Sequence, residues 1–146
     1  MDVLLVCLMS WLALGASLPI PRFSALSAGA PQSEAGAYTA AQADTGKTVY
    51  DQNCSSCHGA ALRGGANEFA APALAGPFFL EKWSGHPVEE LFRYASENMP
   101  PDKRLSSEAE YLDVTAYILQ VLKYPAGPAE LTAQSPAMKR PIERRP

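Results

Sequence analysis

The sequence has little charge, few cysteines and no long apolar run, and each shortage argues against a class of protein. Charged residues make up 18% of the 146-residue chain, and its formal net charge is −3. Proteins that bind nucleic acid usually carry a basic stripe, so no nucleic-acid partner is expected. Three cysteines are an odd number and too few for a small scaffold held by disulfides. The longest apolar run, residues 3–15, is shorter than the roughly 20 residues of a membrane-spanning helix.

This apolar run has the form of a secretory leader, because small residues and proline follow it. Cleavage is expected after Gly15, Ser27 or Ala30, and each would remove Cys7. The start of the run lacks a basic side chain, which leaves an uncleaved anchor as the alternative. We therefore expect residues 1–30 to be an export leader with its lead-in. The protein is then periplasmic with no membrane span after cleavage, or tethered to the membrane if the leader stays.

The first predicted helix runs from about residue 40 to residue 53. Thr39 lies three residues before Gln42, which is the spacing of a capping box. Gly46, in the middle of this helix, costs about 1 kcal/mol relative to alanine. Either the helix is a poor one, or a second helix crosses it closely at Gly46.

Two further helices and a short helical turn at 78–83 are predicted in the second half of the chain. Pro87 suits the first position of a helix, and apolar residues follow it at three- and four-residue spacing until a proline pair stops it. Ser107 and Glu110 have capping-box spacing ahead of a helix that runs to about Lys123 and is apolar on more than one side. With no convincing pair of strands, the sequence predicts a small all-α fold with three main helices plus loops.

The C-terminal segment, residues 125–146, contains five prolines and shows no helical periodicity. It carries four basic and two acidic side chains, whereas residues 31–124 carry seven basic and twelve acidic ones. We therefore expect one acidic domain over residues 31–124, followed by a flexible, Pro-rich, basic tail at 125–146.

The motif that carries chemistry is Cys54-Ser55-Ser56-Cys57-His58. Cys-x-x-Cys-His is the attachment signature of c-type haem. Two thiols three positions apart on a helical turn can each add to one vinyl group of the same porphyrin edge. The next residue, His58, is then held so that its imidazole reaches the iron. The motif predicts one haem c, bound covalently through Cys54 and Cys57.

Three other uses of these residues are less well supported by the sequence. A thioredoxin-like dithiol would need a βαβ context, which the chain lacks. A zinc site would have to use Cys54, Cys57, His58 and His86, and the adjacent Cys57 and His58 have difficulty reaching one tetrahedral ion. A disulfide between Cys54 and Cys57 would close only a tiny loop and would restrict the unfolded chain little.

One axial histidine leaves a sixth iron position, for which the candidates are Met99, Met138, His86 or no ligand. Met99 is favoured because it ends a predicted helix and is followed by the rigid pair Pro100-Pro101. Met138 lies in the predicted flexible tail, and His86 lies at a helix start. Histidine–methionine ligation raises the reduction potential relative to two histidines. An open sixth position would instead suit a haem enzyme or a gas sensor.

Several features, taken in chain order, match one known family: Gly46-x-x-x-Tyr50, the Cys54–His58 motif, the sequence APALAG at 71–76, Trp83, Met99-Pro100-Pro101 and the sequence YLDVTAYIL at 111–119. Over about residues 39–124 the chain resembles the class I monohaem c-type cytochromes. Among these it most resembles the cytochrome c subunits and domains that accompany periplasmic dehydrogenases, including quinoprotein alcohol and sugar dehydrogenases.

The resemblance implies roles for further residues. In the family, the proline that matches Pro72 gives its carbonyl to the other ring nitrogen of the axial histidine, which would orient His58. The side chains that would line the haem faces are Leu62, Leu74 and Phe79. Trp83 matches a position near the haem propionates, where it is either a hydrogen-bond donor or an apolar anchor. The terminal helices cross in this family, which would set Gly46 opposite Ala116–Tyr117.

The function expected from the motif and the resemblance is one-electron transfer by a carrier that is not itself an enzyme. No constellation of acid, base and nucleophile is present, so no catalytic residue is assigned. Expected partners are redox proteins, with a dehydrogenase as donor and an oxidase or another cytochrome as acceptor. The acidic domain suggests a partner with a positive rim. The alternative is an electron-accepting subunit held tightly in a dehydrogenase complex.

Overall fold

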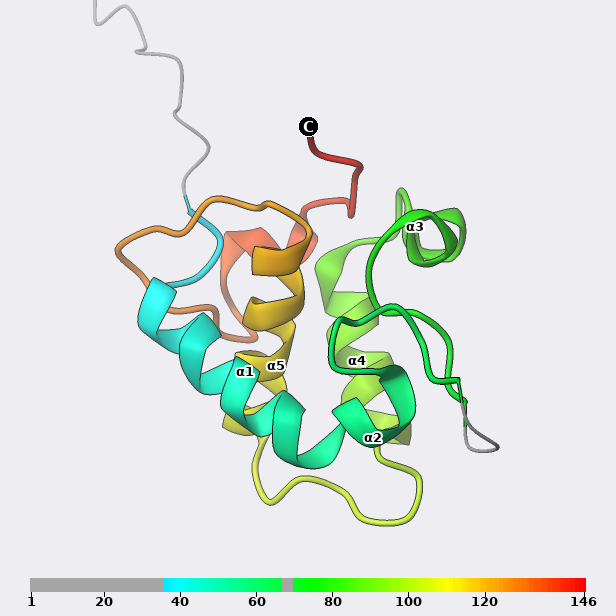
Figure 1. Ribbon diagram of the computed structural model, residues 1–146. Helices are drawn as coiled ribbons and strands as arrows, with labels where there is room; N and C mark the ends of the chain where they lie inside the picture. Colours follow the sequence, from blue (N-terminus) through cyan, green and yellow to red (C-terminus); the bar gives the residue numbers. More distant parts are fainter. Residues whose placement is uncertain (1–35, 67–69) are drawn as a thin grey trace, which may run out of the picture. The chain divides into compact units, whose positions relative to one another are not determined.

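Short helices joined by loops make up the described part of the chain. The computed structural model describes residues 36–66 and 70–146, so the predicted leader at 1–30 lies outside the described residues. In chain order the helices are α1 (Ala40–Asn53), α2 (Ser55–His58), α3 (Pro77–Trp83), α4 (Val88–Asn98), α5 (Glu108–Val121) and the 3-10 helix η1 (Pro136–Lys139) (Figure 1). Extended segments of these two ranges pair only through isolated bridges. The prediction of a small all-α fold is confirmed.

The fold is built on the crossing of α1 and α5 (Figure 1). Gly46 makes this crossing possible, because a Cβ atom placed on it would lie 1.8 Å from the carbonyl oxygen of Asp113. A second helix therefore does cross α1 at Gly46. The crossing lies one turn closer to the start of α5 than Ala116–Tyr117, where the resemblance had placed it. At that next turn the ring of Tyr117 fills the interface and packs on the ring of Tyr50, with the two ring centroids 5.5 Å apart.

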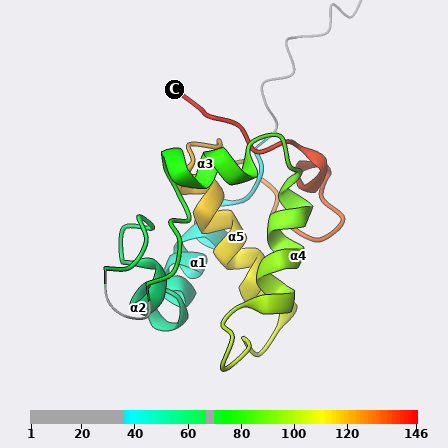
Figure 2. The same cartoon turned by 90° about the vertical axis from the view of Figure 1, so that its right-hand side faces the viewer.

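The capping box predicted at the start of α5 is present. The Ser107 hydroxyl accepts a hydrogen bond from the Glu110 backbone N–H, and the Glu110 carboxylate accepts one from the Ser107 N–H. The carboxylate also accepts bonds from the hydroxyl and the N–H of Ser106, and these bonds lower the pKa of Glu110. After this start α5 lies between α1 and α4, so its apolar residues are buried on more than one side (Figure 2).

The capping box predicted at the start of α1 is only half formed. The Thr39 hydroxyl accepts a bond from the Gln42 backbone N–H at 3.1 Å, as predicted. The Gln42 side chain does not return to the cap. Its amide nitrogen donates to the Leu131 carbonyl at 2.9 Å, and its amide oxygen accepts from the Leu131 N–H at 2.7 Å. The Gln42 side chain therefore binds the C-terminal segment instead of completing the capping box.

The shorter helices lie where the sequence placed them, with small differences at their ends. α3 covers the predicted helical turn, and α4 begins at Val88, with Pro87 as its N-cap rather than its first helical residue. α5 ends at Val121, two residues before the predicted Lys123. Within the two described ranges, no helix is long and apolar enough to cross a membrane.

The segment 125–146 is not the flexible tail that the sequence predicted. Leu131, Met138 and Ile142 are each almost fully buried in the same core as α1 and α5. The prolines mislead here, because they exclude a long helix without excluding an extended chain that packs through single apolar side chains. We call residues 125–146 the C-terminal strap.

Backbone hydrogen bonds fix the strap at two places. Near its start it pairs with the chain that enters α1, where the Gly127 N–H donates to the Tyr38 carbonyl at 2.7 Å. Near its end it pairs with the link between α3 and α4. There the Gly85 N–H donates to Ile142 at 2.9 Å, the Ile142 N–H donates to His86 at 2.8 Å, and the Val88 N–H donates to the Arg140 carbonyl at 3.0 Å. The strap therefore joins the entry to α1 and the link between α3 and α4 into one core.

Candidate functional site

An apolar cavity lies among α2, α3, α4 and α5 and the loops between them. It encloses about 1080 Å³ of space free of atoms, counted out to its open mouth. Eight of the nine residues predicted to hold a cofactor line it: Cys54, Cys57, His58, Pro72, Leu74, Phe79, Trp83 and Met99. The ninth, Leu62, is buried but is not among the lining residues.

Leu62 instead supports the loop beside the cavity. Its carbonyl accepts hydrogen bonds from the N–H groups of Leu74 and Ala75, at 2.9 and 3.1 Å. These bonds hold the segment that carries Leu74 against the cavity. The resemblance implies a place for the Leu62 side chain at the haem face, which stays a prediction; the structure shows its backbone supporting the Leu74 segment.

A single helical turn presents both thiols to the cavity. α1 ends at Asn53, the Cys54 N–H still donates to Tyr50, and the chain then turns again so that the His58 N–H donates to the Cys54 carbonyl at 2.9 Å. Both cysteines are partly buried free thiols. Burial, with a smaller contribution from Cys57, raises the pKa of Cys54 to about 11. Cys54 is therefore a neutral thiol at pH 7, unlike the low-pKa thiolate of a redox-active dithiol.

His58 is held firmly from its ring and from its backbone. Its ring Nδ1 lies 2.7 Å from the Pro72 carbonyl oxygen, which is the hydrogen bond that the resemblance implied. A carbonyl can only accept, so Nδ1 carries the proton and Nε2 is left as the nitrogen able to bind a metal. The His58 carbonyl accepts from the Gly64 N–H at 2.9 Å.

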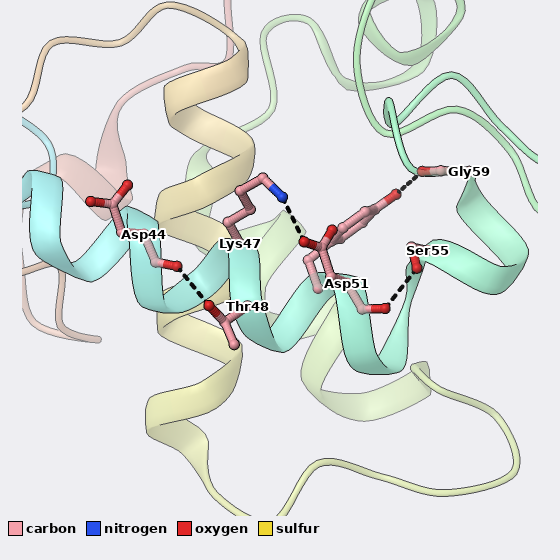
Figure 3. A network of polar contacts seen from close by, with 7 residues as sticks. Asp44, Lys47, Thr48, Asp51, Ser55 and Gly59 are labelled. Atoms are coloured by element: carbon pink, nitrogen blue, oxygen red, sulfur yellow. Dashed lines mark hydrogen bonds and ion pairs between the residues drawn. The ribbon is translucent and has the colours of Figure 1, made fainter.

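The residue after His58 is also fixed, by a buried hydroxyl of α1. Tyr50 donates its hydroxyl to the Gly59 carbonyl at 2.6 Å, a bond that Figure 3 shows. Burial, the largest cause, raises the pKa of Tyr50 well above its usual range. Gly59 has φ of +77°, and a Cβ atom on it would lie 2.5 Å from the Gly64 carbonyl oxygen. Only glycine allows the chain to turn this closely behind the histidine.

The opposite, solvent-facing side of α1 carries polar pairs that take no part in the cavity. Figure 3 shows Lys47 beside Asp51, and the Thr48 and Ser55 hydroxyls donate to the backbone carbonyls of Asp44 and Asp51. These contacts are exposed, so they contribute little stability. They explain why α1 carries charge on one side while its other side packs on α5.

Met99 lies on the other side of the cavity, directly after α4. Its N–H donates to the Ala95 carbonyl at 2.8 Å, which makes it the C-cap of that helix. Its carbonyl accepts a hydrogen bond from the Tyr111 hydroxyl at 2.7 Å. Sequence reasoning had counted Tyr111 only as an apolar residue of α5. The signal that could have found it is that a buried tyrosine usually needs a hydrogen-bond partner for its hydroxyl.

The other two candidate ligands lie away from the cavity. Met138 is almost fully buried in η1 among the residues of the strap. The His86 ring nitrogen Nδ1 lies 2.7 Å from the Glu90 carboxylate on the exposed side of α4. Neither residue lines the cavity, whereas Met99 does.

Trp83 belongs to an aromatic wall that separates the cavity from solvent. Its ring stacks on Phe79 with centroids 6.2 Å apart and meets Tyr94 edge-on at 5.8 Å. The Lys82 ammonium lies 5.4 Å from the Trp83 ring centroid and 5.1 Å from that of Tyr94. Lys82 also lines the cavity, and sequence reasoning did not single it out. Phe78, at the cavity rim, is 81% exposed.

A four-ligand zinc site is not formed by the described residues. None of their histidine, cysteine and carboxylate side chains gather in groups of three or more that could hold a metal ion. His86, which a zinc site would need, is occupied by Glu90 away from the cavity. The ligand set that the cavity does offer is one imidazole, one thioether and two thiols within an apolar lining, which suits a porphyrin rather than a bare ion.

Comparisons with known proteins identify the family. The sequence model of the family described as "Cytochrome C oxidase, cbb3-type, subunit III" matches residues 41–118. Among solved structures, the chain is similar to one described as "Crystal Structure of the Sulfane Dehydrogenase SoxCD from Paracoccus pantotrophus". The two are 26% identical with a TM-score of 0.44, over 54% of this chain and 42% of that one. The chain thus matches less than half the length of that relative. No curated protein sequence matches it significantly.

Proposed function

The chain belongs to this cytochrome c family, and on that premise we propose that it is a one-electron carrier with a single haem c. The haem would be attached through Cys54 and Cys57, with His58 and Met99 as its axial ligands. One observation carries the proposal: both thiols, the histidine and the methionine line the same apolar cavity. The family supports an electron carrier rather than an enzyme.

The residues present fit such a cofactor. When bound, a c-type haem supplies an iron that gains or loses one electron. The hydrogen bond from His58 to Pro72 fixes the ring tautomer and raises the donor strength of the free nitrogen. The lining of Leu74, Phe79 and Trp83 excludes water, which favours the less charged, reduced state.

The position of Met99 argues against the other alternative, a haem enzyme or gas sensor with an open sixth position. Met99 is the C-cap of α4, its N–H and carbonyl are both hydrogen-bonded, and it lines the cavity. A residue fixed in this way favours a filled sixth position. Filled coordination suits a centre that passes electrons and binds no substrate.

The proposed partners are redox proteins, with a dehydrogenase or another donor on one side and a terminal acceptor on the other. With the basic strap packed on it, the domain still has the net charge of −3 of the whole chain, which supports a partner with a positive rim, and the rate of encounter should fall as salt rises. A tail free to wrap a partner would favour the alternative of a subunit held in a dehydrogenase complex. The strap packs on its own domain instead, so the free carrier is the better proposal.

We also propose that the protein works outside the cytoplasm, in the periplasm. The support is the apolar run at residues 3–15, followed by small residues, which has the form of an export leader. Sequencing the N-terminus of the mature protein tests this proposal. A chain that starts after Gly15, Ser27 or Ala30 supports it, and a chain that keeps residue 1 in the cytosolic fraction contradicts it.

The proposed function is tested by producing the full chain in a bacterium that has the machinery for attaching c-type haem. The intact mass should equal the chain plus one haem, and a potentiometric titration should follow a reversible one-electron curve. The double variant Cys54→Ser, Cys57→Ser should lose the covalent haem, whereas Ser56→Ala, an exposed position in the same turn, should keep it. A wild-type chain that leaves this host without covalent haem would contradict the proposal.

A further inference from the structure

One buried hydroxyl joins both ends of the loop that follows Met99. The Tyr111 hydroxyl, on the first turns of α5, donates to the Met99 carbonyl at 2.7 Å and accepts from the Leu105 N–H at 3.0 Å. Tyr111 is itself buried and lines the cavity. The hydroxyl therefore uses its donor and one acceptor position on two backbone groups six residues apart.

Besides this hydroxyl, the loop is held by the packing of Leu105 against the core and by exposed bonds from Ser106 to the Glu110 carboxylate. Residues 101–104 are exposed, and none of the described residues makes a backbone–backbone hydrogen bond with residues 100–106. Pro100 and Pro101 have no N–H to offer. The side chain of Arg104 reaches the Glu97 carbonyl at 3.3 Å, in an exposed contact. Tyr111 thus provides the buried polar connection between this loop and the helical core.

We propose that Tyr111 is a positioning residue, which holds Met99 in place as the sixth ligand. The inference deepens the proposed function and rests on it. In this role Tyr111 is not a ligand; it acts through the Met99 carbonyl. By bonding to that carbonyl, Tyr111 links the position of Met99 to α5 and so to the helix crossing at Gly46. Tyr50, which bonds behind His58, belongs to the other helix of this crossing.

Replacing Tyr111 with phenylalanine removes this link while keeping the ring that fills the core. The Met99 carbonyl and the Leu105 N–H would both lose their partner, and a buried group without a partner destabilises the state that buries it. The loop would gain by opening, because water can then satisfy both groups. Opening moves Met99 away from the cavity, so the sixth position becomes accessible to other ligands.

The experiment compares the holoproteins of Tyr111→Phe and Tyr117→Phe with the wild type. Tyr117 is the matched control, since it is a buried tyrosine of the same helix whose ring packs on Tyr50 instead of the loop. Imidazole is titrated into the oxidised proteins. The loss of the two hydrogen bonds should increase the apparent affinity for imidazole about tenfold in Tyr111→Phe. Tyr117→Phe should bind imidazole like the wild type.

Two further measurements separate this inference from the function on which it rests. Met99→Ala should lose the weak red-edge absorption band of the sulfur–iron bond; if it keeps the band, the proposed ligation itself is wrong. If Met99→Ala loses the band but Tyr111→Phe binds imidazole no more tightly than Tyr117→Phe, only the positioning role is wrong. Denaturant unfolding of both tyrosine variants shows whether a general loss of stability accounts for the result. If Tyr111→Phe and Tyr117→Phe bind imidazole equally tightly although their stabilities differ, the positioning role is also wrong.

Discussion

The two sides of the cavity are held in different ways. On the histidine side, residues 54–66 and 70–75, backbone bonds join one segment to the other: Cys57 bonds to Ala71, and Leu62 bonds to Leu74 and Ala75, while His58 bonds to Gly64. On the methionine side, residues 98–111, the loop from 100 to 106 has no such backbone bonds among the described residues, and one hydroxyl joins its ends. The histidine side therefore has many parallel constraints, whereas the methionine side depends on Tyr111.

With the ligands proposed above, this difference would keep His58 fixed and Met99 exchangeable. A tyrosine from each of the two crossing helices reaches one side: Tyr50 of α1 bonds behind His58, and Tyr111 of α5 bonds to Met99. Removing Tyr50 leaves the other bonds of the histidine side in place. Removing Tyr111 leaves its loop with few. The two sides should therefore respond unequally to similar substitutions.

The largest effect is expected where both sides are broken together, at the helix crossing. In an open helix, Gly46→Ala would stabilise the protein by about 1 kcal/mol. Here the new Cβ would clash with the Asp113 carbonyl, so α1 and α5 must separate and the free energy of unfolding should fall by about 3 kcal/mol or more. Urea unfolding measures the change. Thr45→Ala, exposed on the same helix, is the control and should be near neutral. A stabilised Gly46→Ala variant would show that the helices do not touch there.

The next largest effect is expected in the C-terminal strap, which pairs with the link between α3 and α4 and belongs to neither side of the cavity. Ile142 is fully buried, and Ile142→Ala should lower the free energy of unfolding by about 2–3 kcal/mol. Arg144→Ala, at an exposed position two residues later, should change it little. Below the unfolding transition both variants should keep the red-edge band. Equal stabilities for the two variants would indicate that residues 125–146 are the flexible tail that the sequence predicted and do not pack in the core.

A smaller effect compares the two tyrosines directly. Tyr50→Phe leaves the Gly59 carbonyl without its partner and should cost about 1–2 kcal/mol of unfolding free energy. Because the histidine side keeps its backbone bonds, this variant should bind imidazole like the wild type, in contrast to Tyr111→Phe. If Tyr50→Phe opens the sixth position as readily as Tyr111→Phe does, the two sides are not held differently.

The smallest effect concerns the cap that starts the methionine side's helix. Bonds from Ser106 and Ser107 lower the pKa of Glu110, so its carboxylate stabilises the fold above the pKa that it has in the unfolded chain. This contribution is lost as the pH falls through the lowered pKa of the folded state. Glu110→Gln should therefore be less stable than the wild type at pH 7, and the difference should shrink in acid. A difference that is constant from pH 7 to pH 3 would contradict the capping role.

The sequence predicted most of what depends on local signals. The spacing of Ser107 and Glu110 located α5, and the Cys54–His58 motif located the cavity. Gly46 alone left a poor helix or a close crossing open, and only the family resemblance favoured the crossing. The sequence missed features that the tertiary fold decides: the bond from Gln42 to Leu131, the bond from Tyr111 to Met99, and the burial of Ile142. Helix caps and periodicities are properties of neighbouring residues. The partner of a buried amide or hydroxyl is decided by the tertiary fold, so no local pattern announces it.

The central claim is that His58 and Met99 face each other across one covalent haem, and the most direct test is the absorption spectrum of the oxidised holoprotein. The wild type and Met138→Ala should both show the weak red-edge sulfur–iron band, because Met138 lies in the strap away from the cavity. Met99→Ala should lack the band and have a lower reduction potential. If instead Met99→Ala keeps the band and Met138→Ala loses it, the arrangement described for the methionine side is wrong.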